Sequence, residues 1–220
     1  MSKDAFWALI QEAKTACGQD LNAMEDYLRE QLVSMGPAAA KKFHDILQTY
    51  EDLADQYGLW DAVSVIKEYG CSDDGFIDFR AWLIAQGKEV YMNALRDPDT
   101  LADIEPYGDC CFECLSYVGD YAYEQLTGRS AYDEMEPDRI EKMRDELKKD
   151  IVYKDGIQYP REPKDLPRFL PRLCEKYGGP ERFQVAPSTW NFDLHEIRWL
   201  LNEGKARDQA VQRKEGSGVR

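Results

Sequence analysis

The sequence lacks the patterns by which membrane proteins and familiar enzymes are recognised. No apolar run approaches the roughly 18–20 residues that a membrane helix needs. There is no Gly-x-Ser-x-Gly, no P-loop and no Gly-x-Gly-x-x-Gly. The two histidines, His44 and His195, form no paired-ligand spacing, so each is expected to be a surface or structural histidine. We therefore expect no membrane segment, no cofactor and no enzyme built on a familiar catalytic scheme.

The chain also lacks a regular cysteine framework and an apolar secretion signal at its start. Its six cysteines are irregularly spaced, and thiols stay reduced in the cytosol, so we expect free thiols and a cytoplasmic location. Cys111 and Cys114 form a C-x-x-C pair beside Cys110. Zinc needs four ligands, and a redox pair prefers a strand-to-helix turn. Core packing is therefore the favoured interpretation for Cys111, which continues an apolar helical stripe.

Basic residues are scarce in the first two thirds of the chain. Residues 1–150 contain 32 acidic and 15 basic residues, a net charge of −17, whereas residues 151–220 contain 10 acidic and 13 basic residues, a net charge of +3. Within 97–138, twelve acidic residues accompany a single basic residue, Arg129. Such a segment repels nucleic acid, and it is typical either of a solvated face or of a surface that binds a basic protein partner.

The chain does contain apolar residues at helical spacing. Hydrophobic residues make up 43% of it, enough for a core, and they recur three or four positions apart in successive segments. Most of these segments end at a glycine, which favours helix termination. We therefore predict a mainly α fold, a helical bundle whose core includes Trp7, Trp60 and Trp82. The stripes place helices over 6–17, 21–35, 37–57, 59–70, 79–87, 88–96, 111–128 and 137–151.

The character of the chain changes near residue 151. Asp155-Gly156 between two short apolar segments predicts a small β-hairpin over 151–159, and four prolines then interrupt regular helix. The apolar residues among them are expected to pack onto the helical core; they are Leu166, Phe169, Leu170 and Leu173. We predict three parts: an acidic helical domain at 1–150, an irregular Pro-rich appendage packed on it at 151–204, and a basic, disordered tail at 205–220.

An Asp-rich segment at 70–84 looks like a calcium loop. When Gly75 is placed at the sixth position of an EF-hand, the first and last ligand positions fall on Gly70 and Ala81. Neither side chain offers a carboxylate, so the segment is not an ordinary calcium site. We predict instead that Ser72, Asp73 or Asp74 caps the following helix, with Gly75 in the turn.

Two further interpretations concern the acids of this segment. Asp78 with Arg80, or Arg80 with another acid, is expected to form a fixed ion pair. Alternatively, Asp73, Asp74 and Asp78 converge with acids from other helices and form the metal site of a hydrolase.

The same segment carries a resemblance to a known family. The run Cys-Ser-Asp-Asp-Gly-Phe at 71–76, with Asp-Phe-Arg-Ala-Trp-Leu-Ile-Ala-Gln-Gly at 78–87, resembles the bacterial domain-of-unknown-function family 4240. Phe6-Trp7, Asp97-Pro98-Asp99 with Leu101, and Ala122-Tyr123 with Thr127-Gly128 fit the same pattern. The resemblance covers residues 4–130 and implies no activity, because the family itself is uncharacterised.

Three functions are compatible with these observations. The favoured one is a non-enzymatic adaptor that binds a basic protein through charge steering and a hydrophobic centre, for example an immunity protein or inhibitor that mimics phosphate charge. Trp190 or Trp199 is a candidate anchor in such an interface. The second is the metal-dependent hydrolase, and the third is a bundle that binds its own basic tail or a second copy. The candidate binding residues come from two places: the Asp-rich segment, and a pair of acids four positions apart on one helix. They are Asp73, Asp74, Asp78 and Arg80 in the segment, and Asp120 and Glu124 on the helix.

Overall fold

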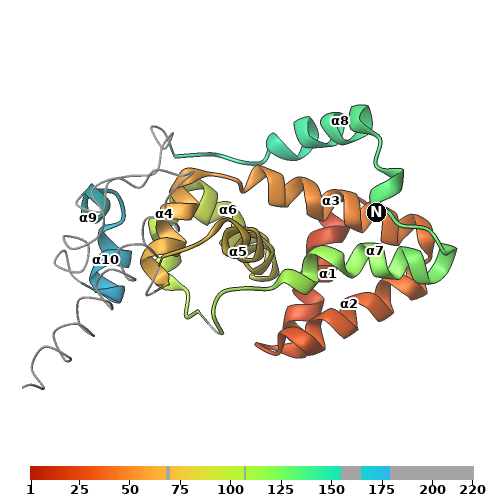
Figure 1. Cartoon of the computed structure of the whole chain (residues 1–220), viewed down its shortest axis with the longest axis horizontal. Coiled ribbons are helices and arrows are strands. Elements are labelled where there is room, and N and C mark those ends of the chain that lie inside the picture. The colour runs from red at the N-terminus through yellow and green to blue at the C-terminus, as the bar shows by residue number, and fades with distance from the viewer. Residues whose placement is uncertain (68–69, 107, 155–164, 179–220) are drawn as a thin grey trace, which may run out of the picture.

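The computed structural model describes residues 1–67, 70–106, 108–154 and 165–178 (Figure 1). These residues are mainly helical, as the sequence predicts, and they contain no β-strand. Most of the predicted hairpin, at 155–159, lies outside the described residues. The predicted tail also lies outside them, as do Trp190, His195 and Trp199. The division of the chain into three parts stays a prediction. None of the helices in the described ranges is long and apolar enough to span a membrane.

The first two helices end where the sequence predicts, and the first begins three residues earlier than predicted. Ser2 and Asp20 precede α1 (Lys3–Cys17) and α2 (Leu21–Met35), and each side chain accepts a hydrogen bond from a backbone N–H of the first helical turn. These N–H groups have no partner within the helix, so the caps stabilise both starts. A glycine ends each helix, as expected.

The break between the third and fourth predicted helices is present, but it lies earlier than predicted. α3 (Pro37–Leu53) ends four residues earlier than the apolar stripe suggests, and α4 (Tyr57–Ile66) begins after an extended Gln56. The break turns the chain so that Trp60 packs 4.4 Å from Phe76, measured between ring centroids. Apolar residues continue through the break because both helices bury a face, so the stripe alone could not give its position.

The helix that contains Trp82 is also longer than predicted. It begins at Asp73 rather than near residue 79, so the Asp-rich segment is largely helical and not a loop. Up to residue 148 the remaining α-helices follow the predicted order, with two short 3₁₀ helices between them that were not predicted. These elements are α5 (Asp73–Ala85), α6 (Lys88–Arg96), the 3₁₀ helix η1 (Pro98–Asp103), α7 (Glu113–Thr127), the 3₁₀ helix η2 (Tyr132–Glu134) and α8 (Pro137–Lys148).

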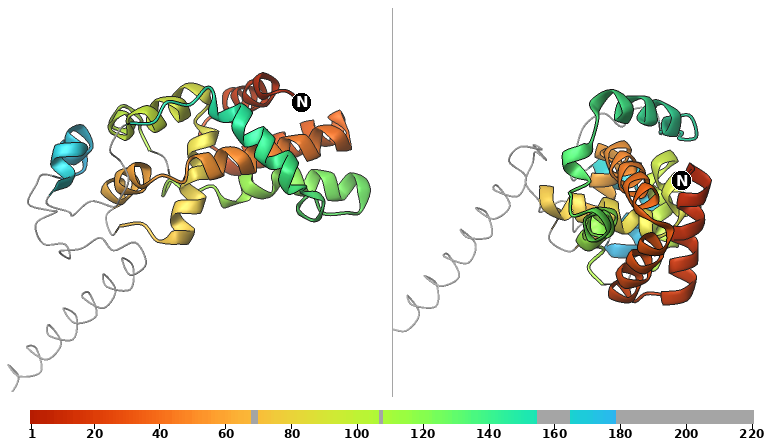
Figure 2. Two further views of the ribbon diagram at one scale, coloured as in Figure 1. Left: turned by 90° about the horizontal axis from the view of Figure 1, so that it is seen from above. Right: turned by 90° about the vertical axis from the view of Figure 1, so that its right-hand side faces the viewer.

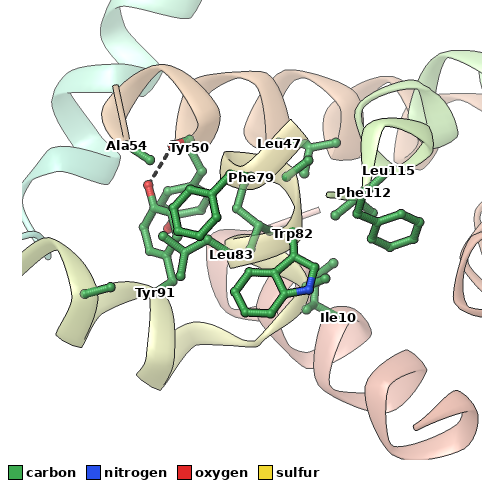
Figure 3. Close-up of a cluster of buried hydrophobic side chains, with 14 of the residues drawn as sticks. Ile10, Leu47, Tyr50, Ala54, Phe79, Trp82, Leu83, Tyr91, Phe112 and Leu115 are labelled. Atoms are coloured by element: carbon green, nitrogen blue, oxygen red, sulfur yellow. Dashed lines mark hydrogen bonds between the residues drawn. The ribbon is translucent and has the colours of Figure 1, made fainter. Parts of the chain in front are cut away.

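α5 forms the centre of the bundle. It is seen end-on in the middle of Figure 1 and contacts α1, α3, α4, α6 and α7. Trp82 on α5 is almost fully buried among the aromatic and aliphatic side chains of Figure 3. Beside it, the buried Tyr91 hydroxyl donates a 2.6 Å hydrogen bond to the backbone carbonyl of Tyr50. Trp7 and Trp60 are buried as well, so the predicted placement of all three tryptophans in the core is confirmed.

α3 and α7 are the most closely packed pair of helices, and a glycine lies between them. A Cβ atom on Gly119 of α7 would lie 2.8 Å from the backbone nitrogen, the Cα and the Cβ of His44 on α3. Only a residue without a side chain fits at this distance. α8 contacts α3 on the side away from α2, as the views in Figures 1 and 2 show.

Two short helices begin after residue 164. α9 (Leu166–Phe169) and α10 (Pro171–Tyr177) each have a proline in the first turn, where the missing N–H is tolerated. Leu166, Leu170 and Leu173 are buried against the core and Phe169 is half-buried, which confirms the predicted packing of these residues. α10 contacts α4 and η1.

Candidate functional site

The start of α5 is a capped helix terminus. The Ser72 hydroxyl oxygen accepts a 3.1 Å hydrogen bond from the backbone N–H of Gly75, which confirms the predicted cap. Gly75 itself lies inside the first helical turn, so its predicted place in a preceding turn was wrong. Asp73 and Asp74 are exposed in that same turn, where negative charge stabilises the positive end of the helix dipole.

Asp78 lies one turn further along α5 and is half-buried. Burial raises its pKa, and Glu113 adds to the increase. Lys67 is the nearby cation that opposes it. Within the described part of the chain, no three His, Cys, Asp or Glu side chains are grouped as metal ligands. Among the described residues, Asp73, Asp74 and Asp78 therefore form no such group with acids from other helices, and the hydrolase interpretation stays a prediction.

Arg80 contacts α3 and the residues after it. Its guanidinium donates a 3.2 Å hydrogen bond to the Glu51 backbone carbonyl and pairs with the Asp55 carboxylate at 3.7 Å. It also lies 5.1 Å from the centroid of the Phe76 ring. Of the two predicted pairings, the structure contains the one between Arg80 and another acid.

A buried glutamate on α3 escaped the sequence analysis. Glu51 is only 6% exposed, and its carboxylate accepts a 2.5 Å hydrogen bond from the Ser116 hydroxyl of α7. Burial raises the pKa of Glu51 to about 7, although the Ser116 hydrogen bond and Arg80 both lower it. In the sequence, its position directly after Tyr50 on an apolar stripe was the one available signal.

The predicted i, i+4 acid pair on α7 is divided between the interior and the surface. Asp120 is buried and accepts hydrogen bonds from the Ser130 hydroxyl at 2.9 Å and from the Ala131 backbone N–H at 2.5 Å. It thereby holds the turn that follows α7. Glu124 is exposed. The two carboxylates therefore differ in environment, and the binding role predicted for them stays a prediction.

His44 takes the structural one of its two predicted roles, whereas Cys111 differs from its expected surroundings. His44 is fully buried, lies edge-on to Tyr132 with ring centroids 4.3 Å apart, and has its pKa lowered to about 4 by burial. Cys111 precedes α7 and is half-buried, so it does not continue the apolar stripe. Its thiol accepts a 3.0 Å hydrogen bond from the Lys67 ammonium group.

Three tyrosines gather on the surface of α7 and η2, and we call them the tyrosine face. Tyr117 and Tyr121 stack with ring centroids 5.9 Å apart, and Tyr121 is 45% exposed. Tyr132 is 37% exposed, and its hydroxyl donates to the Ser116 carbonyl at 3.4 Å. Both Tyr117 and Tyr121 raise the pKa of Tyr132, after the larger effects of burial and of Glu51, so the three phenol groups are neighbours.

Acidic side chains border the tyrosine face. Glu113 and Asp78 both raise the pKa of Tyr117, after the larger effect of burial, so both carboxylates lie near its hydroxyl. Glu124 follows Tyr121 by three positions on α7, a spacing that makes the two side chains neighbours. Two of the predicted binding residues, Asp78 and Glu124, therefore border a face whose tyrosines the sequence analysis did not single out.

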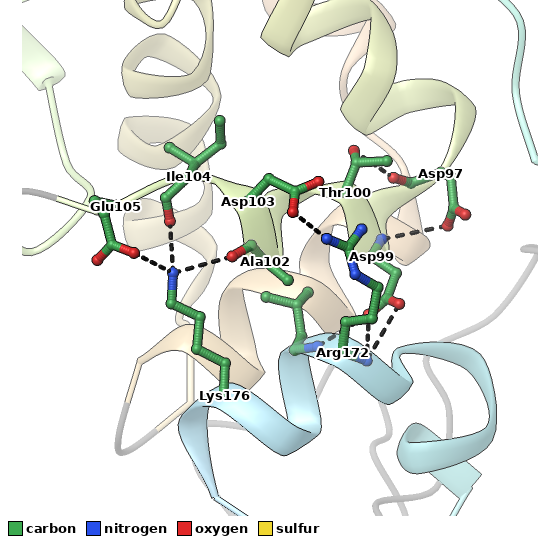
Figure 4. A network of polar contacts seen from close by, with 10 residues as sticks. Asp97, Asp99, Thr100, Ala102, Asp103, Ile104, Glu105, Arg172 and Lys176 are labelled. Carbon is green, nitrogen blue, oxygen red and sulfur yellow. Dashed lines mark hydrogen bonds and ion pairs between the residues drawn. The ribbon is translucent and has the colours of Figure 1, made fainter.

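The first part of the acidic stretch is bound by the chain itself (Figure 4). The buried Asp99 carboxylate accepts hydrogen bonds from the backbone N–H groups of Arg172 and Leu173 at the start of α10. The Arg172 guanidinium also pairs with Asp103, and the Lys176 ammonium group pairs with Glu105 at 2.8 Å. The sequence presented 97–138 as one uncompensated acidic segment, but the cations that compensate its first part come from about seventy residues later.

Replacing Asp99 by alanine is expected to loosen α10. The change leaves two backbone N–H groups of its first turn without an acceptor, which costs about 1–2 kcal/mol. Hydrogen exchange at the amides of 172–177 should become faster than in the parent protein. Asp103→Ala is the control, because it removes an exposed ion pair and should leave this exchange nearly unchanged. Equal protection of α10 in Asp99→Ala and the parent would contradict the prediction.

Comparison with known proteins supports the resemblance seen in the sequence. No curated protein and no solved structure matches the chain. The family described as protein of unknown function (DUF4240) matches residues 1–125, which is more than half of the 220 residues. The matched segment contains α1 to α6, η1 and most of α7, including Tyr117 and Tyr121. The chain therefore belongs to the DUF4240 family.

Proposed function

We propose that the protein is a non-enzymatic binding module that receives a basic protein partner on its tyrosine face. The single observation that carries the proposal is the stacked pair of half-buried Tyr117 and exposed Tyr121, with Tyr132 beside them and carboxylates at the border. Tyrosine and arginine dominate the energetically important contacts of protein interfaces. A guanidinium group stacks on a phenol ring and pairs with an adjacent carboxylate at the same time.

The charge of the chain favours the same type of partner. A net charge of −14 attracts basic proteins from a distance and accelerates their association. The tyrosine face supplies the apolar contacts at the centre of the interface, which electrostatic attraction alone does not provide. An immunity protein or inhibitor that masks a basic site is one form of this function. The hydrolase alternative has less support, because it requires a grouping of carboxylates that the described residues do not form.

A titration with two synthetic peptides tests the proposal. One peptide alternates arginine with serine and the other alternates lysine with serine, so they differ in stacking ability and not in charge. We expect the arginine peptide to bind more tightly, and Tyr121→Ala to weaken its binding by about tenfold. Leu126→Ala is the matched control, because Leu126 is 38% exposed on the same helix but lies off the tyrosine face.

The contribution of the carboxylates is tested in the same titration. Glu113→Gln with Glu124→Gln should weaken binding at low salt more than at moderate salt, since salt screens exposed charges. Glu89→Gln on α6 is the control for the loss of an exposed acid. If the two peptides bind equally and Tyr121→Ala has no effect, the tyrosine face is not the binding surface.

A further inference from the structure

A pocket of about 440 Å³ lies between the start of α1, the first half of α3 and α8. Its volume is within the range of small-molecule sites. Its apolar lining comes chiefly from Ile46 of α3 and from Met143 and Leu147 of α8, all three of which are buried. A ligand in this pocket would therefore cover side chains that belong to the core.

The polar lining of the pocket is mainly basic, with one acid, Glu146, although the chain as a whole is acidic. Lys42 of α3 and Arg139 and Lys142 of α8 line it. Within the described ranges, none of these three cations has a carboxylate at ion-pair distance. By contrast Lys3, which also lines the pocket, pairs with Asp150 at 2.6 Å and lies 4.0 Å from Glu146.

The cations of the pocket repel one another. Burial lowers the pKa of Lys42, and the charge of Arg139 is the next largest cause. The Asp45 carboxylate offsets part of this repulsion, because it raises the pKa of Lys42, but Asp45 forms its ion pair with Lys41 at 2.5 Å. An anion bound between α3 and α8 removes the remaining repulsion, because it neutralises cations from both helices.

From the apolar lining beneath uncompensated cations, we infer that the pocket binds a small organic anion that has an apolar body and one oxyanion head, a carboxylate or a phosphate monoester. The body lies against Ile46, Met143 and Leu147, and the head lies among Lys42, Arg139 and Lys142. Arg139 suits either head, because a guanidinium group matches the geometry of both.

The net charge of the protein favours a small anion over a large polyanion as the ligand of the pocket. A nucleic acid or an anionic membrane extends over many Debye lengths of about 8 Å, so the net charge of −14 repels it. A small anion inside the pocket instead experiences mainly the three adjacent cations. This site is separate from the tyrosine face, and neither proposal depends on the other.

Calorimetric titration of the full chain with four probes tests the inference. Hexanoate and hexyl phosphate carry both body and head, inorganic phosphate carries the head alone, and 1-hexanol carries the body alone. We expect at least one of the amphiphilic anions to bind at least tenfold more tightly than either part. The anion that binds more tightly identifies the head that the pocket prefers.

Variants assign the binding to the pocket. Lys42→Gln with Arg139→Gln is expected to weaken binding of the amphiphilic anion at least tenfold. Lys88→Gln with Lys148→Gln removes the same charge from exposed positions outside the pocket lining and should leave binding unchanged. Unfolding midpoints confirm that both double variants are folded. The inference is overturned if no probe binds, if one part binds as tightly as the whole, or if the two double variants bind alike.

Discussion

Replacing Gly119 by alanine is expected to lower the free energy of unfolding by about 2–3 kcal/mol. In an ordinary helix interior this change stabilises by about 0.5–1 kcal/mol, because alanine has less backbone freedom to lose than glycine. At Gly119 the added Cβ lies 2.8 Å from three atoms of His44, two of them backbone atoms. Since backbone atoms cannot rotate away as a side chain can, α3 and α7 must separate and lose packing along their contact.

Urea denaturation measures this effect, and Gly75→Ala is the matched control. Gly75 is also helical, but its added Cβ would meet the Ser72 hydroxyl oxygen at 3.1 Å, and that side chain can move. We expect the control to change stability by at most about 1 kcal/mol. A Gly119→Ala protein that is as stable as the parent would show that α3 and α7 can move apart without loss.

Replacing Glu51 by glutamine is expected to change how stability depends on pH. The folded pKa of about 7 lies above the ordinary value of 4.5, so the folded protein keeps a proton that the unfolded chain releases. Glu51 therefore has no effect below pH 4.5, lowers stability progressively as the pH rises to 7, and has its full unfavourable effect above that. That effect corresponds to about 3 kcal/mol.

Glutamine keeps an oxygen that accepts the Ser116 hydrogen bond but does not ionise. The stability of Glu51→Gln relative to the parent should therefore rise by about 3 kcal/mol between pH 4.5 and pH 8. Urea denaturation at several pH values measures this difference, in which the other titrating groups largely cancel. Glu89→Gln should follow the parent at every pH. A constant difference between Glu51→Gln and the parent would show that Glu51 is ionised throughout this range.

In the parent protein, His44 and Glu51 have opposite effects on how the free energy of unfolding depends on pH. Its folded pKa of about 4 lies below the ordinary 6.5, so its contribution is complete above pH 6.5 and is lost as the pH falls to 4. Between pH 4.5 and 6.5 this rising contribution opposes the falling contribution of Glu51. Over that interval the effects of Glu51 and His44 on the free energy of unfolding of the parent nearly cancel. In the Glu51→Gln variant only the effect of His44 remains, so this variant should become more stable as the pH rises from 4.5 to 6.5.

Local patterns determined much of the helical architecture. Apolar periodicity and terminal glycines act within a few residues, so the helices at 21–35 and 88–96, and the first helix from residue 6 to residue 17, could be predicted from the chain alone. The same reasoning failed at Gln56 and at Asp73. At these points contacts with distant residues decide where a helix ends or begins, and those contacts leave no periodic signal.

The candidate sites depended on tertiary structure. The sequence directed attention to acids at 73–78 and 97–138, but it could not show that Asp99 caps a helix more than seventy residues away, or that Asp120 is buried. The tyrosine face combines residues of α7 and η2. The basic pocket combines residues of α1, α3 and α8. By itself the sequence determined the helices, the overall charge and the family resemblance, because these depend on local patterns and composition. Only the folded structure decided which side chains are neighbours and which charges remain uncompensated, because packing between distant segments sets both.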